Sequence, residues 1–463
     1  MDTNAPKTPA TLPFAAWRAM APARAAHEVQ ARAAALAPAL RAAALAWLKP
    51  EGELAAELAP GKPVGASLLA IQEQTIASKL APTPDVLHPL AGVPYFLKDL
   101  FDLGGVPTRA GSTFLAQIRP FPAHDCAIAQ RLRELGAGCA GKTHLVEFAA
   151  GLTGENPHYG DCPHPRFPDR LSGGSSSGSA ALVAAGVVPL AIGTDTGGSV
   201  RVPAAWCGLY GFRLTPGDAL IRDAFPLAPT MDTAGWFTAN AGDMLAAWQA
   251  IAGGRANPPD EPRLVGNDSP HPSQKIRGCY LPMDALLTGA DPEVVAACDA
   301  AAVRICAPAE AVAKDKLLAA WRGAVDAYIT IGMSEAHAVH RDWLAPYREH
   351  YDPVIWQRFS DAANYPPAQL AAARTKLEEV RGAFRDFFAD HDFLVLPAVP
   401  GPAPRKADCT PELRRNILAL TAPASLAGLP VLSVPVALPS GLTAGLQIIL
   451  PVANSAVVPW VLR

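Results

Sequence analysis

Two short stretches rich in glycine and serine combine hydroxyl groups with a backbone that can approach a ligand closely. The first is GGSSSGS, which contains Ser175, and the second is DTGGS, which ends at Ser199. Serine can supply a nucleophile, and consecutive glycines let backbone N–H groups come close to a substrate oxygen. These residue types indicate acyl transfer with stabilisation of an oxyanion.

A serine hydroxyl is a poor nucleophile without a base, and none of the 11 histidines stands in an obvious partner motif. The stretch GVPYFLKDLFDLGG instead places Lys98 inside an apolar run. Burial disfavours the charged ammonium and can lower a lysine pKa by up to about 3 to 5 units. A buried, neutral Lys98 is therefore a candidate proton acceptor.

A helix-like segment and a strand-like segment separate the two serine stretches. SAALVAAG favours a short helix and VVPLAIGTD favours a strand. A helix of about nine residues advances roughly 13 Å and a strand of about six residues returns roughly 20 Å, so Ser175 and Ser199 are predicted at the same end of one layer. Ligands collect at that end of open α/β sheets.

Three local patterns allow other interpretations. Residues 174–178 match G-x-S-x-G, which would make Ser176 the nucleophile of an α/β-hydrolase elbow, but the preceding CPHPRFPDRLS is not a buried strand. A phosphate-binding loop at the first serine stretch would need a GK[ST] sequence within it, and GGSSSGS contains none. His337 and His340 lack a third ligand motif, so we expect ordinary helix residues rather than a metal site.

Arg201 follows Ser199 by two residues and could contact a substrate carboxylate. Asp195 stands nearby in the sequence and favours a structural ion pair for this arginine instead. We therefore leave Arg201 outside the predicted site.

The composition indicates a globular chain with little net charge. The 463 residues are 50% hydrophobic with a formal net charge of -3, which does not favour direct binding to nucleic acid or to an anionic membrane. The longest apolar run, AALVAAGVVPLAIG, is too short and too broken by proline to span a bilayer. Eight cysteines without a CxxC pair indicate free thiols, and no export signal is evident, so we expect a cytoplasmic protein.

Helical and strand-like stretches alternate after about residue 64, which is typical of an α/β core. Residues 1–63 are predicted to form an N-terminal helical layer packed on the core, and residues 64–463 one large domain. The Pro- and Gly-rich residues 253–278 suit a surface connection, and a mostly helical pattern follows up to about residue 390. FLVLPAVP, LPVLSVPVAL and TAGLQIILP are predicted to complete the sheet.

Three segments together resemble the amidase signature family of serine hydrolases. They are GVPYFLKDLFDLGGVPTRAGS, GGSSSGSAALVAAGVVPLAIGTDTGGSVRVPAAWCGLYGFRLTPG and LTAPASLAGLPVLSVPVALPSGLTAGLQII, in family order. The resemblance implies an α/β fold with a large mixed β-sheet core covered by helices on both faces. It also implies a variable, mainly helical insertion at about residues 255–390 that shapes the substrate pocket.

The same resemblance implies a Ser, cis-Ser, Lys triad. Carried over residue by residue, it makes Ser199 the nucleophile, Ser175 the bridging serine and Lys98 the base. The 24 positions from Ser175 to Ser199 match the family spacing. The cis peptide bond of the family would be Gly174–Ser175 here.

The resemblance further implies an oxyanion hole made by the backbone N–H groups of Thr196, Gly197, Gly198 and Ser199. Ser176 would donate supporting hydrogen bonds within the triad loop. The implied mechanism needs neither a metal nor an organic cofactor.

The resemblance predicts hydrolysis of a carboxamide C–N bond in a small-molecule substrate through an acyl-serine intermediate. Two departures from the family pattern are Ser177, where glycine is common, and Val202, where the glutaminase component of tRNA-dependent amidotransferases commonly has glutamine. The second departure favours a self-contained hydrolase. The alternatives are an A-type glutaminase component of such an amidotransferase, a hydrolase of urea-type amides such as biuret or allophanate, and a catalytically silent binding protein. A homo-oligomer is compatible with the sequence.

Overall fold

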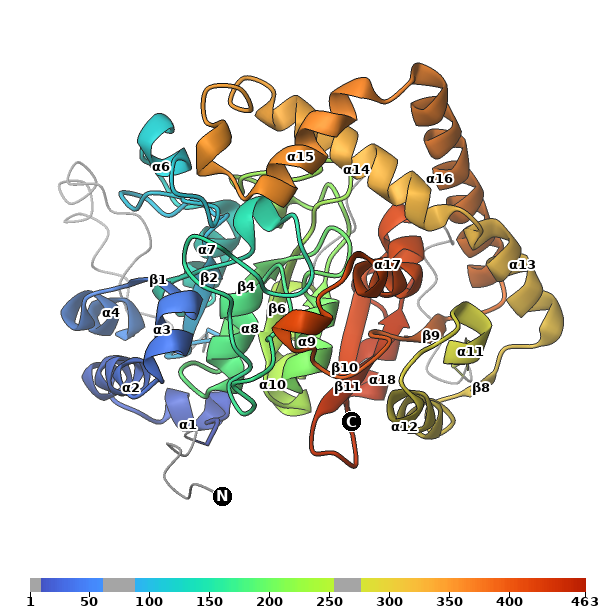
Figure 1. Ribbon diagram of the computed structural model, residues 1–463. Coiled ribbons are helices and arrows are strands. Elements are labelled where there is room, and N and C mark those ends of the chain that lie inside the picture. The colour runs from blue at the N-terminus through green and yellow to red at the C-terminus, as the bar shows by residue number, and fades with distance from the viewer. Residues whose placement is uncertain (1–9, 61–87, 254–275) are drawn as a thin grey trace, which may run out of the picture.

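The computed structural model describes residues 10–60, 88–253 and 276–463. The expected boundary between residues 63 and 64, and most of the 253–278 connection, lie outside these ranges. Within them, 11 strands form one sheet that helices surround (Figure 1). The predicted α/β class with a large mixed sheet is confirmed.

The sheet mixes parallel and antiparallel neighbours. Its strands are β1 (Leu45–Leu48), β2 (Pro94–Lys98), β3 (Gly138–Thr143), β4 (Leu190–Thr194), β5 (Tyr210–Arg213), β6 (Ala234–Thr238), β7 (Gly278–Tyr280), β8 (Ala307–Pro308), β9 (Phe393–Pro397), β10 (Val431–Ala437) and β11 (Thr443–Ile449). Their order in space is β1-β3-β2-β4-β6-β5-β10-β11-β9-β7-β8. Neighbours are parallel in β3-β2-β4 and in β9-β7-β8, and antiparallel elsewhere.

Helices make up most of the remaining structure. The α-helices are α1 (Phe14–Arg18), α2 (Pro22–Ala34), α3 (Pro38–Ala44), α4 (Glu51–Leu58), α6 (Leu115–Ile118), α7 (Ala127–Glu134), α8 (Ser177–Ala184), α9 (Arg201–Cys207), α10 (Ala241–Ile251), α11 (Met283–Leu286), α12 (Pro292–Ala302), α13 (Ala311–Trp321), α14 (Ala324–His340), α15 (Pro353–Asp361), α16 (Pro367–Phe388), α17 (Pro411–Leu426) and α18 (Val457–Val461). The short 3-10 helices are η1 (Glu147–Ala149), η2 (Ala219–Ile221), η3 (Arg348–His350), η4 (Ala362–Asn364) and η5 (Lys406–Asp408).

Helices cover both faces of the sheet. Because successive side chains of a strand point to opposite faces, each central strand contributes to two hydrophobic clusters. In β2, Tyr95 and Leu97 belong to a hydrophobic cluster shared with α7 and α10, whereas Phe96 belongs to a second cluster shared with α8. In β6, Trp236 joins the first cluster and Phe237 joins the second. The central strands are therefore buried on both faces and rich in apolar residues, as expected for strands covered on both sides.

The late strands complete the early sheet, as the sequence predicted. β10 pairs with β5 on one side and with β11 on the other, and β11 pairs with β9. The chain thus returns after the helical region to extend the sheet that carries β2 and β4.

The N-terminal segment forms helices α1 to α4 beside α8. Trp17, Leu54 and Leu58 are buried in the same cluster as residues of α8. The segment also supplies β1, where Leu45 lies opposite Thr143 of β3. The alanine-rich sequence of this segment carries no local signal for a strand. The strand forms because pairing with the open edge of β3 is a tertiary contact that overrides local propensity.

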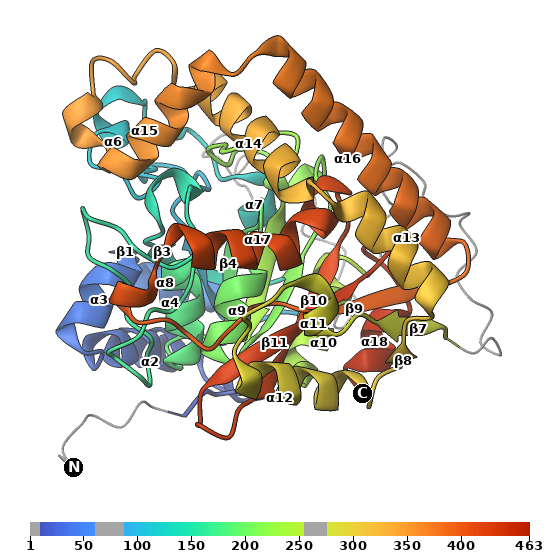
Figure 2. The same ribbon diagram turned by 45° about the vertical axis from the view of Figure 1, so that its right-hand side comes forward.

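Most of the chain between β7 and β9 is helical. α14 packs against α16 and α17, and α13 packs against α16. Both views place α13, α14 and α16 along one side of the molecule, with α17 between them and the sheet (Figures 1 and 2). α17 begins where Thr410 accepts a hydrogen bond from the N–H of Leu413 at 3.1 Å, with Pro411 in the first turn.

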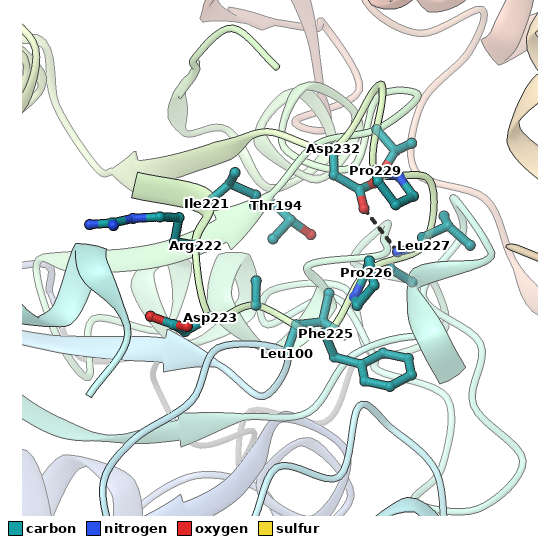
Figure 3. Close-up of a pocket in the computed structure, with 13 residues that line it drawn as sticks. Leu100, Thr194, Ile221, Arg222, Asp223, Phe225, Pro226, Leu227, Pro229 and Asp232 are labelled. Carbon is teal, nitrogen blue, oxygen red and sulfur yellow. Dashed lines mark hydrogen bonds between the residues drawn. The ribbon is translucent and has the colours of Figure 1, made fainter. Parts of the chain in front are cut away.

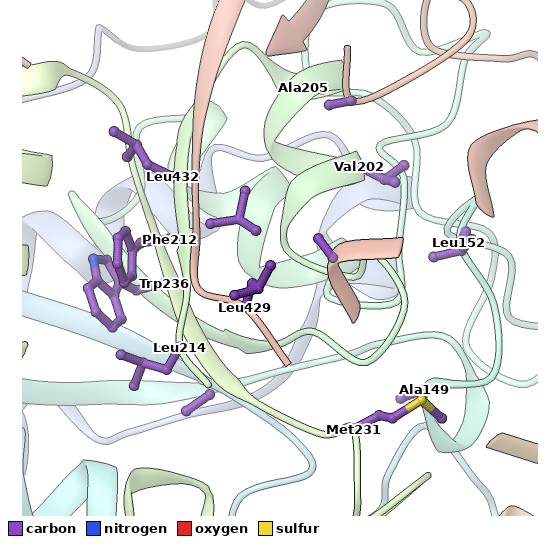
Figure 4. Packing of buried hydrophobic residues seen from close by; sticks show 14 of the residues in the cluster. Ala149, Leu152, Val202, Ala205, Phe212, Leu214, Met231, Trp236, Leu429 and Leu432 are labelled. Atoms are coloured by element: carbon purple, nitrogen blue, oxygen red, sulfur yellow. The ribbon is translucent and has the colours of Figure 1, made fainter. Parts of the chain in front are cut away.

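The helix after the second serine stretch, α9, is embedded in the core (Figure 4). Val202 and Ala205 of α9 belong to the cluster that contains Phe212 and Trp236, whose rings stack at 5.1 Å between centroids. This packing fixes α9, and it fixes the loop that leads into α9 as well.

The two histidines of α14 make structural contacts. His337 Nδ1 lies 2.9 Å from the Phe359 carbonyl oxygen, and His340 Nδ1 lies 2.9 Å from the Tyr351 hydroxyl. Burial lowers the pKa of His340 to about 3. Both contacts fit the expectation of ordinary helix residues.

Candidate active site

Lys98 ends β2 and lies fully buried between the two serine stretches. Its Nζ donates hydrogen bonds to three hydroxyl groups, those of Ser175 at 2.8 Å, Thr194 at 2.7 Å and Ser176 at 3.0 Å. β2 lies between β3 and β4 and is parallel to both. The amine at the end of β2 therefore lies at the same edge of the sheet as the end of β4. The structure thus joins Lys98 directly to Ser175 and Ser176.

Burial lowers the pKa of Lys98 to about 7, although the negative charges of Asp195 and Asp232 oppose that shift. Near neutral pH a large fraction of the amine is therefore uncharged. Such an amine can accept a proton from a hydroxyl with which it is already hydrogen-bonded.

Ser175 is held by its backbone as well as by Lys98. The Gly174–Ser175 peptide bond is cis, at the position that the family resemblance implied. The Gly174 N–H donates to the Leu152 carbonyl at 2.8 Å, and the Val146 N–H donates to the Ser175 carbonyl at 3.2 Å. These bonds fix the loop against residues 146–152.

The two serine stretches meet, as the sequence predicted. The Ser176 N–H donates to the Ser199 carbonyl at 3.4 Å, and the Ser176 hydroxyl donates to the Thr194 carbonyl at 3.1 Å. Ser199 is buried at the start of the segment that leads into α9. In the described part of the chain, no hydrogen bond joins the hydroxyls of Ser175 and Ser199, so the structure forms only the Lys98–Ser175 half of the expected relay.

The loop before Ser199 offers backbone donors, with one difference from the expectation. The Gly198 N–H donates to the Asp195 carboxylate at 2.8 Å, so this group is already engaged and does not face an oxyanion. The N–H groups of Thr196, Gly197 and Ser199 have no hydrogen-bond partner among the described residues. Gly198 has a φ of 129°, in the region that favours glycine, which lets the loop fold around the carboxylate.

Asp195 is the centre of a buried ion-pair network. Its carboxylate lies 2.8 Å from Arg201 and 3.1 Å from Arg213, and it accepts a hydrogen bond from the Val200 N–H at 2.9 Å. Burial by itself would raise the pKa of Asp195, but Arg201 and Arg213 outweigh it and hold the pKa well below its usual range. The structural ion pair expected for Arg201 is therefore present, and this arginine is engaged within the protein.

Three side chains near the loop had not been singled out from the sequence. Thr194 binds Lys98, and the Thr196 hydroxyl donates to the Asp232 carboxylate at 2.5 Å. A Cβ atom on Gly197 would lie 2.1 Å from the hydroxyl oxygen of Tyr328, so α14 places this tyrosine directly against the loop. Thr194 is adjacent to the second serine stretch in sequence, but nothing local marks Asp232 or Tyr328.

A cavity of about 210 Å³ adjoins the site on the side of Thr194 (Figure 3). Its polar wall residues are Thr194, Thr196, Asp232, Arg222 and Asp223. Its apolar wall is formed mainly by Leu100, Ile221, Phe225, Pro226, Leu227 and Pro229. The cavity wall therefore includes Thr194, which binds Lys98, and Thr196, which belongs to the loop that bears Ser199.

A family model described as Amidase matches residues 66–454. The chain belongs to the amidase family. Its members among the relatives below act on amides, and the chain is accordingly an enzyme of the amide hydrolase class.

Curated relatives are similar over most of their length. The chain is 34% identical to AtzE, the 1-carboxybiuret hydrolase component of Pseudomonas sp. (strain ADP), over 76% of this chain and 78% of the relative. It is 32% identical to one component of the glutamyl-tRNA(Gln) amidotransferase of Synechococcus sp. (strain RCC307), over 82% of this chain and 83% of that component.

Solved structures share the fold. A crystal structure of an amidase superposes with a TM-score of 0.75 and 29% identity, covering 96% of this chain and 95% of the other. A structure from work on the origins of an s-triazine catabolic enzyme gives a TM-score of 0.77 and 29% identity, covering 95% and 93%. Among the helices in the described ranges, none combines the length and apolar character needed to cross a membrane.

Proposed function

We propose that this amidase hydrolyses a carboxamide C–N bond of a small molecule through an acyl intermediate on Ser199. The observation that carries the proposal is the buried amine of Lys98, which is hydrogen-bonded at 2.8 Å to Ser175 beside the loop that bears Ser199. A buried lysine with a lowered pKa is a proton acceptor, and a serine next to such a relay is an activated nucleophile.

The reaction proceeds in two halves. The Ser199 oxygen attacks the amide carbon while its proton passes to Ser175, whose own proton passes to Lys98. The tetrahedral intermediate collapses, the C–N bond breaks, and the leaving amine takes a proton back through Ser175. Water then attacks the acyl-serine along the same relay and releases the carboxylic acid.

The N–H groups of Thr196, Gly197 and Ser199 are the donors proposed for the oxyanion, whereas Gly198 is excluded because Asp195 already occupies its N–H. Each well-directed donor of this kind lowers the barrier by about 3 to 4 kcal/mol. No metal or organic cofactor takes part in these steps.

Covalent labelling tests this assignment. A fluorophosphonate probe is expected to label the purified chain, and mass mapping should place the adduct on Ser199. Ser199→Ala should abolish both labelling and turnover while the circular dichroism spectrum stays unchanged. Labelling at Ser176, or activity that survives in Ser199→Ala, would reject Ser199 as the nucleophile.

The similarity to a 1-carboxybiuret hydrolase component supports a urea-type amide as the alternative substrate, and the similarity to an amidotransferase component supports a glutaminase role. Ammonia release from simple amides by the purified chain alone favours the self-contained hydrolase. Activity that appears only on glutamine, and only with added partner proteins, favours the amidotransferase role. Native mass measurement of the same sample determines whether the chain is a homo-oligomer.

A further inference from the structure

The buried polar side chains that line the 210 Å³ cavity are already hydrogen-bonded within the protein. The Thr194 hydroxyl accepts from Lys98 at 2.7 Å, and the Thr196 hydroxyl donates to Asp232 at 2.5 Å. The other carboxylate oxygen of Asp232 accepts from the N–H groups of Leu227 at 2.9 Å and Ala228 at 3.0 Å. A ligand in the cavity would find few unpaired polar groups on these buried walls.

Of the charged residues that line the cavity, only Asp232 is buried, and both of its carboxylate oxygens are hydrogen-bonded within the protein. Arg222 and Asp223 are exposed, whereas Phe225 and Leu227 are buried. Binding a carboxylate inside a dry cavity requires a buried cation, because an unpaired buried charge is very costly. Arg222 is the sole cationic side chain among the lining residues, and its exposure leaves it at the rim.

The volume fits a small ring. A dry apolar cavity of about 150 Å³ is large enough to hold benzene. The cavity in this amidase measures about 210 Å³ and so can hold a single aromatic ring or a branched alkyl group.

We propose that this cavity is the substrate subsite for a compact, uncharged, apolar group, so that the preferred substrates are small aryl or branched alkyl amides. The inference rests on the proposed amide hydrolysis at Ser199 and adds the class of substrate. Two connections support it: Thr196 belongs to the loop that ends at Ser199, and Leu100 follows Lys98 by two residues.

A second cavity, of about 370 Å³, provides the contrast. Its walls include Glu155, Asp161, Arg358, Lys406 and Arg414. A carboxylate of a substrate would find three cationic side chains there, Arg358, Lys406 and Arg414, whereas the first cavity offers it only the exposed Arg222. The first cavity therefore favours uncharged amides, whereas the second would favour charged ones.

Filling the first cavity tests the proposal. Ile221 ends η2 and is only partly buried, so Ile221→Trp should fill the space without disturbing the core. We expect kcat/KM for benzamide to fall by 10-fold or more, through a higher KM, while kcat/KM for acetamide and fluorophosphonate labelling of Ser199 stay near the parental values. Val354→Trp, at an exposed position of the second cavity, is the matched control and should leave both amides unaffected.

The reciprocal variant, Ile221→Ala, enlarges the cavity and should raise kcat/KM for 1-naphthamide relative to benzamide. The proposal is overturned if Ile221→Trp lowers acetamide and benzamide turnover equally, or leaves both unchanged. It is also overturned if the parent enzyme labels at Ser199 and cleaves only amides that carry a carboxylate. Absence of both labelling and amide cleavage in the parent would instead reject the proposed function itself.

Discussion

Lys98 combines full burial with three hydroxyl partners, which is an unusual environment for a residue whose charged form prefers water. The three hydroxyls satisfy its hydrogen-bonding capacity without supplying a negative charge. The negative charges of Asp195 and Asp232 act on Lys98 only from a distance. They raise its pKa and so offset part of the lowering that burial causes. The protein thus keeps the amine buried and hydrogen-bonded, with a pKa of about 7.

The pH profile is the first prediction at this scale. Below a pKa of about 7, Lys98 is protonated and cannot accept a proton, so kcat/KM should rise with pH through about 7 and level off above it. Lys98→Ala should reduce kcat by about 10²- to 10⁴-fold. Stopped ammonia assays from pH 5 to 9 measure both effects. Near-parental activity in a folded Lys98→Ala protein would contradict the relay.

Thr196 gives a second prediction. Its hydroxyl anchors the loop to Asp232, so Thr196→Val should let the Thr196 N–H shift and should lower kcat by about 10- to 100-fold with little change in KM. Thr196→Ser keeps the hydroxyl and should retain most of the activity. Steady-state kinetics on one amide separate the two parameters. A change confined to KM would instead indicate a role in ground-state binding.

At the scale of elements, the site is assembled by strands and helices that are far apart in the chain. β2 supplies Lys98, the N-terminal side of α8 supplies Ser175 and Ser176, and the loop before α9 supplies Ser199. α17 supports that loop, because the Thr421 hydroxyl donates to the Gly197 carbonyl at 2.7 Å. α14 contacts the same loop through Tyr328.

The contact between α14 and the loop leads to a third prediction. In Gly197→Ala the new Cβ would lie 2.1 Å from the Tyr328 hydroxyl oxygen, so the loop must move and kcat should fall by about 100-fold. Adding Tyr328→Ala removes the obstruction and should recover part of the loss.

The matched control for this prediction is Gly52→Ala in α4, where a Cβ would meet nothing within 4 Å. It should leave activity unchanged. A double variant no better than Gly197→Ala alone would show that the loss does not arise from the contact with Tyr328.

At the scale of the whole molecule, the N-terminal helices and the central sheet share one apolar cluster. Leu54 of α4 and Leu182 of α8 both belong to it, together with Ala191 of β4. Because β4 and α8 carry parts of the site, loss of the N-terminal layer would expose apolar surface directly behind the serine stretches.

This sharing gives the fourth prediction. Leu54→Ala should destabilise the protein by about 2 to 5 kcal/mol, and activity should disappear over the same temperature range as the main calorimetric transition. Val312→Ala on α13, which is 68% exposed, should shift stability by no more than about 0.5 kcal/mol. If the N-terminal helices melt separately while activity persists, the coupling is absent.

Much of this architecture was determined locally by the sequence. The alternation of strand-like and helix-like runs predicted β2, α8, β4 and the late strands, because alanine- and leucine-rich runs favour helix, whereas short apolar runs bounded by glycine or proline favour strand. Lys98, Ser175 and Ser199 could be chosen from short motifs, since glycine-rich turns and a lysine within an apolar run are unusual in themselves.

Only the tertiary structure decided which groups complete the site. Asp232 lies 36 positions after Thr196, and Tyr328 comes from a helix whose sequence resembles any other amphipathic helix. The Gly198 N–H is occupied because the Asp195 carboxylate folds back beneath its own loop, and β1 exists because β3 has an open edge. Such contacts depend on which surfaces meet after folding, and contacts between distant residues leave no periodic trace in the local sequence.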